Sequence, residues 1–183
     1  MWNCLGLIVL AAACTGLIVR AIYEQTRCVK LTENSWKGLV AKLQKVDNQA
    51  VEAVAQDFLT PHEGILVMEP EQIWNAVGGY DGIQKMCANA DIMIALAAWI
   101  REINFDASVI VAERMRRDAV HLRRAARRLA VGQFRQIVSG KMSAAAIFEI
   151  QQAAASYYLM RERLFALYKV SLSGLYPRLA EVL

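Results

Sequence analysis

The chain has few residues that would interrupt a helix. Among its 183 residues only three are proline, at Pro61, Pro70 and Pro177, and the glycines cluster only over residues 78–82. Glycine and proline are the residues that most disfavour the interior of a helix. No stretch alternates β-branched and polar residues in the way a half-buried strand does. These absences exclude a sheet and predict an all-α protein.

Residues that carry catalysis or bind metals are also scarce. The chain has four cysteines, at Cys4, Cys14, Cys28 and Cys87, and none of them belongs to a CxxC pair. This pattern is neither a disulfide framework nor a zinc signature. A glycine-rich phosphate loop, a nucleophile elbow and an HExxH motif are absent as well. We therefore expect no cofactor, no metal site and no enzymatic activity.

Two small groups of side chains keep an enzyme open as a third and less favoured class of function. Asp118 and His121 form a D-x-x-H pair, near the E-x-x-H of carboxylate-bridged di-iron bundles, but such a site needs two of these motifs and further glutamates. Asp91 follows Cys87 in an apolar stretch and could be an acid with a shifted pKa. More often such an aspartate is a satisfied polar group that faces another helix. For Asp118, an ion pair with Arg114, four residues earlier, is the simple interpretation.

The N-terminus carries a long uncharged run. No charged side chain occurs from Cys4 to Val19, and with its flanks the run reaches about 20 residues, enough for a helix to cross a hydrocarbon core roughly 30 Å thick. Arg20, Arg27 and Lys30 follow the run, and no positive residue precedes it. Because positive residues stay on the cytoplasmic side, the sequence predicts a single-pass membrane anchor with its N-terminus outside and the bulk of the chain in the cytoplasm.

Two other interpretations of this run stay open. Residues 11–13 are all alanine and Cys14 follows them, as at the cleavage site of an exported protein or a lipoprotein. Against a cleaved signal, the run lacks a positive start and stays apolar beyond that site. The run could also be a helix of a soluble core, but it is apolar on every side, whereas a packed surface helix has one apolar stripe.

The remainder of the chain has the apolar periodicity of long helices. Helices are expected over about 35–59, 81–105, 107–138 and 143–173, with a short one that starts near Pro70 and stops at Gly78 and Gly79. Short connections make neighbouring long helices antiparallel. The sequence thus predicts an anchor and juxtamembrane segment at residues 1–30, and at 31–183 an antiparallel helical bundle of about four long helices. The segment from Ile92 to Ile100 is apolar all round, which favours it as the central helix.

The predicted helix at 107–138 has the most informative pattern. Residues 61–106 have a net charge of −5, whereas residues 107–140 hold eight arginines against Glu113 and Asp118, a net charge of +6. Around the helix, one face is apolar and rich in alanine: Val111, Ala112, Met115, Ala119, Leu122, Ala126, Leu129, Ala130 and Ile137. The other face carries the candidate anion-binding or phosphate-binding residues, Arg116, Arg117, Arg123, Arg124, Arg127 and Arg128, followed by Arg135.

Two hypotheses explain the arginine face. It can be an ordinary solvated face whose arginines pair with nearby acids. Alternatively it binds phosphates, of anionic lipid or, less favoured, of nucleic acid; arginine rather than lysine suits this because its guanidinium makes bidentate contacts. The sequence as a whole predicts a membrane-anchored interaction or structural protein, with a phosphate-binding module as the alternative. A protein partner, an anionic lipid and a second copy of the chain all stay open as partners.

Overall fold

The computed structural model describes residues 33–60, 68–139 and 143–183, and all the regular structure in these ranges is helical. The chain divides into two compact units, Met1–Trp36 and Lys37–Leu183. The predicted anchor at residues 1–30 lies outside the described residues and stays a prediction. Among the helices that are described, none is both long enough and apolar enough to cross a membrane.

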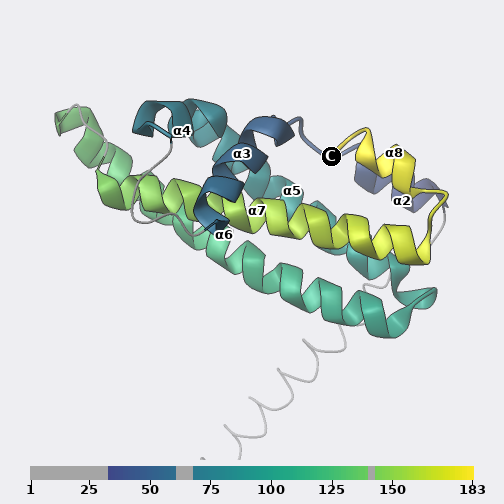
Figure 1. Ribbon diagram of the computed structural model, residues 1–183. Helices are drawn as coiled ribbons and strands as arrows, with labels where there is room; N and C mark the ends of the chain where they lie inside the picture. The colour runs from purple at the N-terminus through teal and green to yellow at the C-terminus, as the bar shows by residue number, and fades with distance from the viewer. Residues whose placement is uncertain (1–32, 61–67, 140–142) are drawn as a thin grey trace, which may run out of the picture. The chain divides into compact units, whose positions relative to one another are not determined.

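Three long helices form the larger unit. They are α5 (Gly79–Trp99), α6 (Phe105–Ser139) and α7 (Ala144–Ser171), and each packs against the other two. Successive long helices run in opposite directions, as Figure 1 shows. The all-α class and the packing of several helices are confirmed, but the bundle has three long helices in its described part where the sequence predicted about four.

The missing long helix is the one predicted at 35–59. Two shorter helices occupy this stretch, α2 (Glu33–Val40) and α3 (Asn48–Leu59). The side chain of Asp47 caps α3 by accepting a hydrogen bond from the backbone N–H of Ala50 at 3.1 Å. An aspartate at this position satisfies a backbone donor that the first turn of a helix leaves free. The apolar periodicity of the sequence continues across the break between α2 and α3, and so it does not predict that break.

A buried asparagine holds that break in place. Asn89 on α5 is fully buried; its Oδ1 accepts from the Gln44 backbone N–H and its Nδ2 donates to the Gln44 carbonyl, both at 2.8 Å. The same Nδ2 donates to the hydroxyl of Tyr157 on α7 at 3.2 Å. Since both backbone polar groups of Gln44 are bound to this amide, the connection between α2 and α3 is not free to join a continuous helix.

Helix α7, not α5, occupies the centre. It packs against α3, α4, α5, α6 and α8, and only one stripe of it, which includes Phe148, Glu162 and Val170, is exposed. Its middle contains three consecutive alanines, Ala153–Ala155, which let neighbouring helices approach closely. Helix α5 packs against fewer elements, and Asp91 and Ala98 on it are exposed.

The shorter elements end and connect the long ones. Helix α4 (Pro70–Ala76) confirms the predicted short helix, and a 3-10 turn, η1 (Ile100–Glu102), follows α5. Gly78 and Gly79 have positive φ values of 74° and 62°, which favour glycine, and a Cβ on Gly82 would lie 1.8 Å from the carbonyl oxygen of Val77. The α4–α5 junction therefore requires this glycine cluster.

Side chains cap the other two long helices. Ser143 caps α7 by accepting from the Ala146 N–H at 3.2 Å, and Asn104 caps α6 by accepting from the Ala107 N–H at 3.3 Å. A further helix, α8 (Tyr176–Ala180), was not expected. Proline tolerates the first turn of a helix, so Pro177 fits the start of this element.

We predict that Asn89→Ala destabilises the fold by about 1–3 kcal/mol, because it leaves the polar groups of Gln44 without partners in a partly buried place. Urea unfolding followed by circular dichroism measures this change. Asn75→Ala, an exposed position on α4, is the control and should change stability by less than about 0.5 kcal/mol. Equal stability of the two variants would contradict the role given to Asn89.

Candidate functional site

Helix α6 has two faces of different chemistry. The buried face consists of Ala112, Met115, Ala119, Leu122, Ala125 and Leu129. Most of the apolar face predicted from the sequence is therefore buried, with Ala125 added, while Val111, Ala126 and Ala130 are half-buried. The side chains of Ile137 and Arg135 lie outside the described residues. The opposite face carries the arginines.

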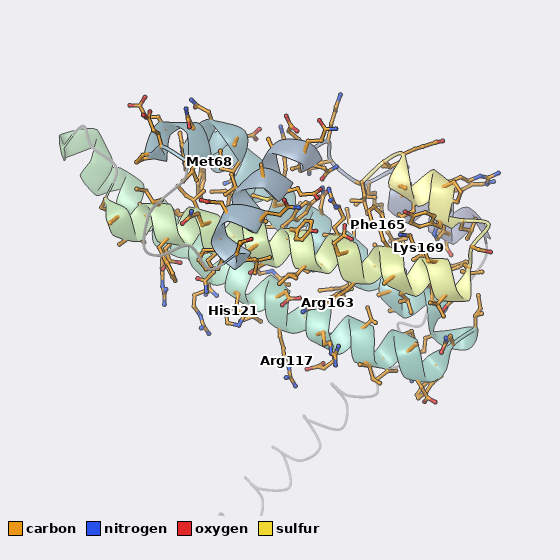
Figure 2. The ribbon with its side chains drawn as sticks, in the orientation of Figure 1. Met68, Arg117, His121, Arg163, Phe165 and Lys169 are labelled. Carbon is orange, nitrogen blue, oxygen red and sulfur yellow. The ribbon has the colours of Figure 1, made fainter. Side chains whose placement is uncertain are left out.

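Two of the predicted arginines share one acid on their own helix. Arg116 and Arg117 pair with Glu113 at 3.4 Å and 3.7 Å, and all three side chains are more than half exposed. Exposed pairs of this kind contribute about 0–1 kcal/mol each, so they constrain the guanidinium groups weakly. Arg117 and His121 project from α6 away from α7, as Figure 2 shows.

Two others join α6 to its neighbours. Arg123 pairs with Asp91 of α5, and Arg128 pairs with Glu149 of α7 at 2.5 Å. Glu149 is only 12% exposed, so that this pair lies at the edge of the α6–α7 contact. The expectation that Asp91 is a satisfied polar group facing another helix is confirmed, although its side chain is largely exposed. These two arginines hold helices together along the edges of the face.

The remaining arginines have no acid partner. Within the described part of the chain, Arg114 and Arg124 make no ion pair, and Arg127 donates only to the backbone carbonyl of Arg123, at 3.3 Å. All three are surface residues of α6. We define the arginine face by the following residues: Arg114, Arg116, Arg117, Arg124, Arg127 and Arg128. Its carboxylates, Glu113 and Glu149, leave it with a clear excess of positive charge.

Asp118 corrects one expectation. Its predicted partner was Arg114, but in the structure it pairs with Arg163 of α7, and its side chain is only 16% exposed. Figure 2 places Arg163 on the side of α7 that faces α6. Burial, followed by the charge of Arg114, lowers the pKa of Arg163. Asp118 thus acts between two helices, which residue spacing within one helix cannot indicate.

The residues considered for catalysis do not form one site. His121 is exposed on the outer side of α6 and Asp118 lies against α7, whereas Cys87 and Asp91 are neighbours on α5, where Asp91 pairs with Arg123 of α6. No group of three potential metal-binding side chains occurs among the described residues. Cys87 lies half-buried on α5, where burial raises the pKa of its thiol, Arg123 lowers it and Asp91 raises it. A thiol with a raised pKa is a poor nucleophile at neutral pH.

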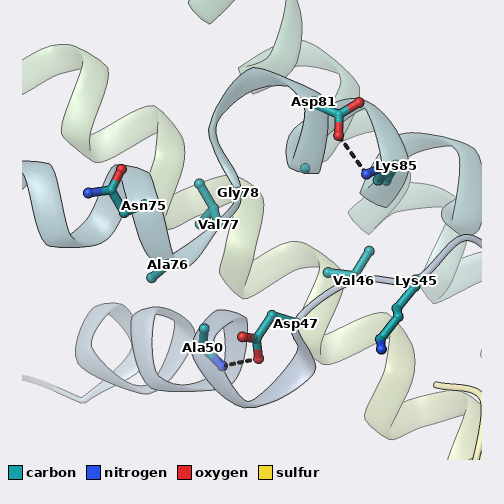
Figure 3. Close-up of a pocket in the computed structure, with 11 residues that line it drawn as sticks. Lys45, Val46, Asp47, Ala50, Asn75, Ala76, Val77, Gly78, Asp81 and Lys85 are labelled. Carbon is teal, nitrogen blue, oxygen red and sulfur yellow. Dashed lines mark hydrogen bonds and ion pairs between the residues drawn. The ribbon is translucent and has the colours of Figure 1, made fainter.

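A surface hollow of about 160 Å³ lies where the connection before α3 meets the α4–α5 junction (Figure 3). It is smaller than the roughly 300–1,000 Å³ typical of ligand pockets. Its acids already have partners: Asp47 caps α3, and Asp81 pairs with Lys85 at 2.5 Å. The hollow therefore offers no convergent set of free polar groups.

Comparisons with known proteins add no assignment. No protein-family model matches the chain, and neither a curated protein nor a solved structure matches it significantly. Whatever function is proposed must therefore come from the chemistry of the arginine face.

We predict that Cys87 is slow to react. With Cys4, Cys14 and Cys28 changed to serine, iodoacetamide should alkylate the folded chain more slowly at neutral pH than the urea-unfolded chain, and the rate should level off at a higher pH, because burial raises the pKa of Cys87. Arg123→Gln should move this pH profile further upward by removing a charge that lowers the pKa.

Asp91→Asn is the matched control for the sign of this effect. It removes a charge that raises the pKa of Cys87, so its profile should move to lower pH. A folded chain that reacts as fast as the unfolded one at neutral pH would instead favour an activated thiol.

Proposed function

We propose that the chain is a non-catalytic helical interaction protein whose arginine face binds a phosphate-bearing, anionic surface. The observation that carries the proposal is the pattern of pairing on α6. The arginines at its edges, Arg123 and Arg128, reach acids of neighbouring helices, while Arg114, Arg124 and Arg127 have none among the described residues.

The alternative, a solvated face that serves only to hold the bundle, accounts for the edge arginines. It does not account for those unpaired among the described residues, Arg114, Arg124 and Arg127. Lysine or glutamine would keep such a face soluble and helical at similar propensity, whereas this helix has eight arginines and no lysine. The planar guanidinium of arginine can donate two hydrogen bonds at once to phosphate oxygens. Phosphate binding would therefore explain why this helix has arginine and not lysine.

The shape of the site favours an extended ligand over a small molecule. A helix face is convex, and arginines at 117, 124 and 128 follow one another along it over about 16 Å, at 1.5 Å per residue. The hollow beside the α4–α5 junction is lined by none of these arginines. A surface with many phosphates can meet several guanidinium groups at once, and the attraction should weaken with salt.

The test compares two variants that lose the same charge. We expect Arg117→Gln combined with Arg124→Gln and Arg127→Gln to elute from phosphocellulose, in a neutral detergent, at much lower salt than the wild-type chain. The helix should persist because glutamine has a similar helix propensity. Circular dichroism confirms that both proteins are folded to the same extent.

The control removes three positive charges elsewhere: Lys42→Gln, Lys45→Gln and Lys169→Gln, all at exposed positions. Its elution should stay close to that of the wild type. If both triple variants elute together, net charge alone explains retention and the arginine face has no special role.

We further propose that residues 1–30 anchor this domain to a membrane, with the bulk of the chain cytoplasmic, or, in the alternative, that the segment is a signal cleaved on export. The uncharged run from Cys4 to Val19 supports both. An anchor would keep the arginine face near a lipid surface, where each basic residue gains about 1 kcal/mol from anionic headgroups.

Leu10→Arg combined with Ile18→Arg should release the chain from membranes washed with carbonate, since a charge near the centre of a spanning helix costs about 2.5–3.5 kcal/mol. Leu10→Ile with Ile18→Leu is the control and should stay in the pellet. A mature N-terminus at Cys14, found by sequencing, would contradict the anchor and support export.

A further inference from the structure

A group of large apolar side chains is exposed where α5 passes into α6. Ile103, Phe105 and Ile110 are 55%, 55% and 54% exposed, and Val109 is 40% exposed. They lie just after η1 and in the first two turns of α6. We call these four residues the apolar corner. Exposed apolar residues are ordinary when scattered singly, but four large ones within eight positions of the chain, 103–110, are unusual and indicate an interaction surface.

The pattern of α6 is reversed at this corner. Further along the helix, Met115 and Leu122 are buried and most large exposed side chains are arginines, with Val120 and Val131 as exposed apolar exceptions. At its start, the residue that is buried is Ser108, at 1% exposure, whose hydroxyl donates to the carbonyl of Phe105 at 3.0 Å. Phe105 and Val109, on either side of it, face solvent. Such a local departure from the amphipathic pattern is expected at functional positions.

The base of the corner is held firmly. Asn104 caps α6 through the Ala107 N–H and also donates to the hydroxyl of Ser171 at the end of α7, at 3.3 Å. Its backbone N–H is bound to the carbonyl of Ile100 at 2.9 Å. Figure 1 shows the start of α6 beside the end of α7. The apolar side chains are thus presented on a fixed support, because the turn beneath them is tied to two helices.

Arg101 lies at the corner, and the arginine face begins further along the helix that follows. The guanidinium of Arg101 lies 5.0 Å from the centre of the Phe105 ring. Arg114 and Arg117 follow one and two turns after Ile110 on the same helix. Three acids also occur here, Glu102 just before Ile103, Asp106 in the first turn of α6, and Glu113. The last of these is already paired with Arg116 and Arg117.

We propose that the apolar corner inserts into the surface of an anionic lipid bilayer while the arginine face contacts the headgroups. This inference rests on the proposed function and names its partner. Apolar side chains that enter the acyl boundary beside arginines that stay among headgroup phosphates are the combination that holds amphipathic helices at a membrane.

The same surface fits nucleic acid less well. A phosphate backbone would satisfy the arginines, and one aromatic ring can stack on a base. Three exposed aliphatic side chains, Ile103, Val109 and Ile110, have no such use on a polyanion and would stay in water. A bilayer takes up all four residues of the corner together with the charge beside them.

The experiment measures the depth of one position in the full chain. The four native cysteines are changed to serine, Ile110→Cys is introduced, and an environment-sensitive fluorophore is attached there. Vesicles of phosphatidylcholine and phosphatidylserine carry bromine atoms on their acyl chains as quenchers. We expect a blue shift and strong quenching, at least several-fold more than for the same fluorophore at Ala53→Cys, an exposed site on α3. Both labelled positions belong to the same chain, so attachment through residues 1–30 alone would not quench one label more than the other.

Variants separate insertion from charge. Phe105→Ser with Val109→Ser should abolish most of the quenching at position 110 but leave elution from phosphocellulose unchanged. Val131→Ser, which removes an exposed apolar residue near the other end of α6, should change neither. Added salt should weaken the quenching, since headgroup attraction helps to dock the corner.

Three results would overturn the inference. A label at position 110 that stays in water on anionic vesicles excludes insertion, and if phosphocellulose retention still depends on the arginine face, the proposed function survives this failure. Equal quenching on vesicles of phosphatidylcholine alone excludes recognition of anionic lipid. A blue shift with duplex DNA or RNA, and none with vesicles, assigns the surface to nucleic acid instead.

Discussion

The structure depends on covering the apolar surface of one central helix. Helix α7 has apolar residues around most of its circumference, so α3, α4, α5, α6 and α8 pack around it and leave only a stripe with Glu162 and Lys169 in solvent. Its buried polar side chains then need partners from the covering helices. Gln151 donates to Asp57 at 3.1 Å and Arg161 to Glu52 at 2.8 Å, both on α3, while Arg163 pairs with Asp118 on α6.

The same requirement explains what the sequence could and could not predict. Helix α6 was predicted to within a few residues because a regular 3.6-residue pattern and its charges lie in one continuous stretch. The break between α2 and α3 was missed because its cause lies 45 residues away, in the amide of Asn89, which binds both backbone polar groups of Gln44. The apolar periodicity of the two flanking helices continues across that break in register and conceals it.

Partner choice among charged residues was the least predictable feature of the candidate site. Within one helix, spacing suggested that Asp118 pairs with Arg114, yet the packing of α6 on α7 brings Arg163 to it. Arg116 and Arg117, by contrast, pair with Glu113 on the same exposed face of their own helix. When both residues of an ion pair point into solvent, their spacing within the helix determines whether they pair. When an acid lies at a contact between two helices, the neighbouring helix supplies its partner, and the sequence does not reveal how that helix packs. Most members of the arginine face were therefore predictable, except that Arg114 takes the place of Arg123, but the division into paired and unpaired arginines was not.

The continuity of α6 links these surfaces. One helix of 35 residues carries the apolar corner at its start and the arginine face along its length, so the two move together as parts of one rigid element. Its inner face is fixed by alanines and leucines against α5 and α7, and its edges by Arg123 and Arg128. Any contact made by the arginine face is thus made without rearranging the bundle. The conformational entropy lost on binding is then mainly that of the side chains of Arg114, Arg124 and Arg127, because the helix that carries them is already fixed. This arrangement suits a broad, repetitive anionic surface, because such a surface adjusts its own phosphates to a row of charges that cannot move relative to one another.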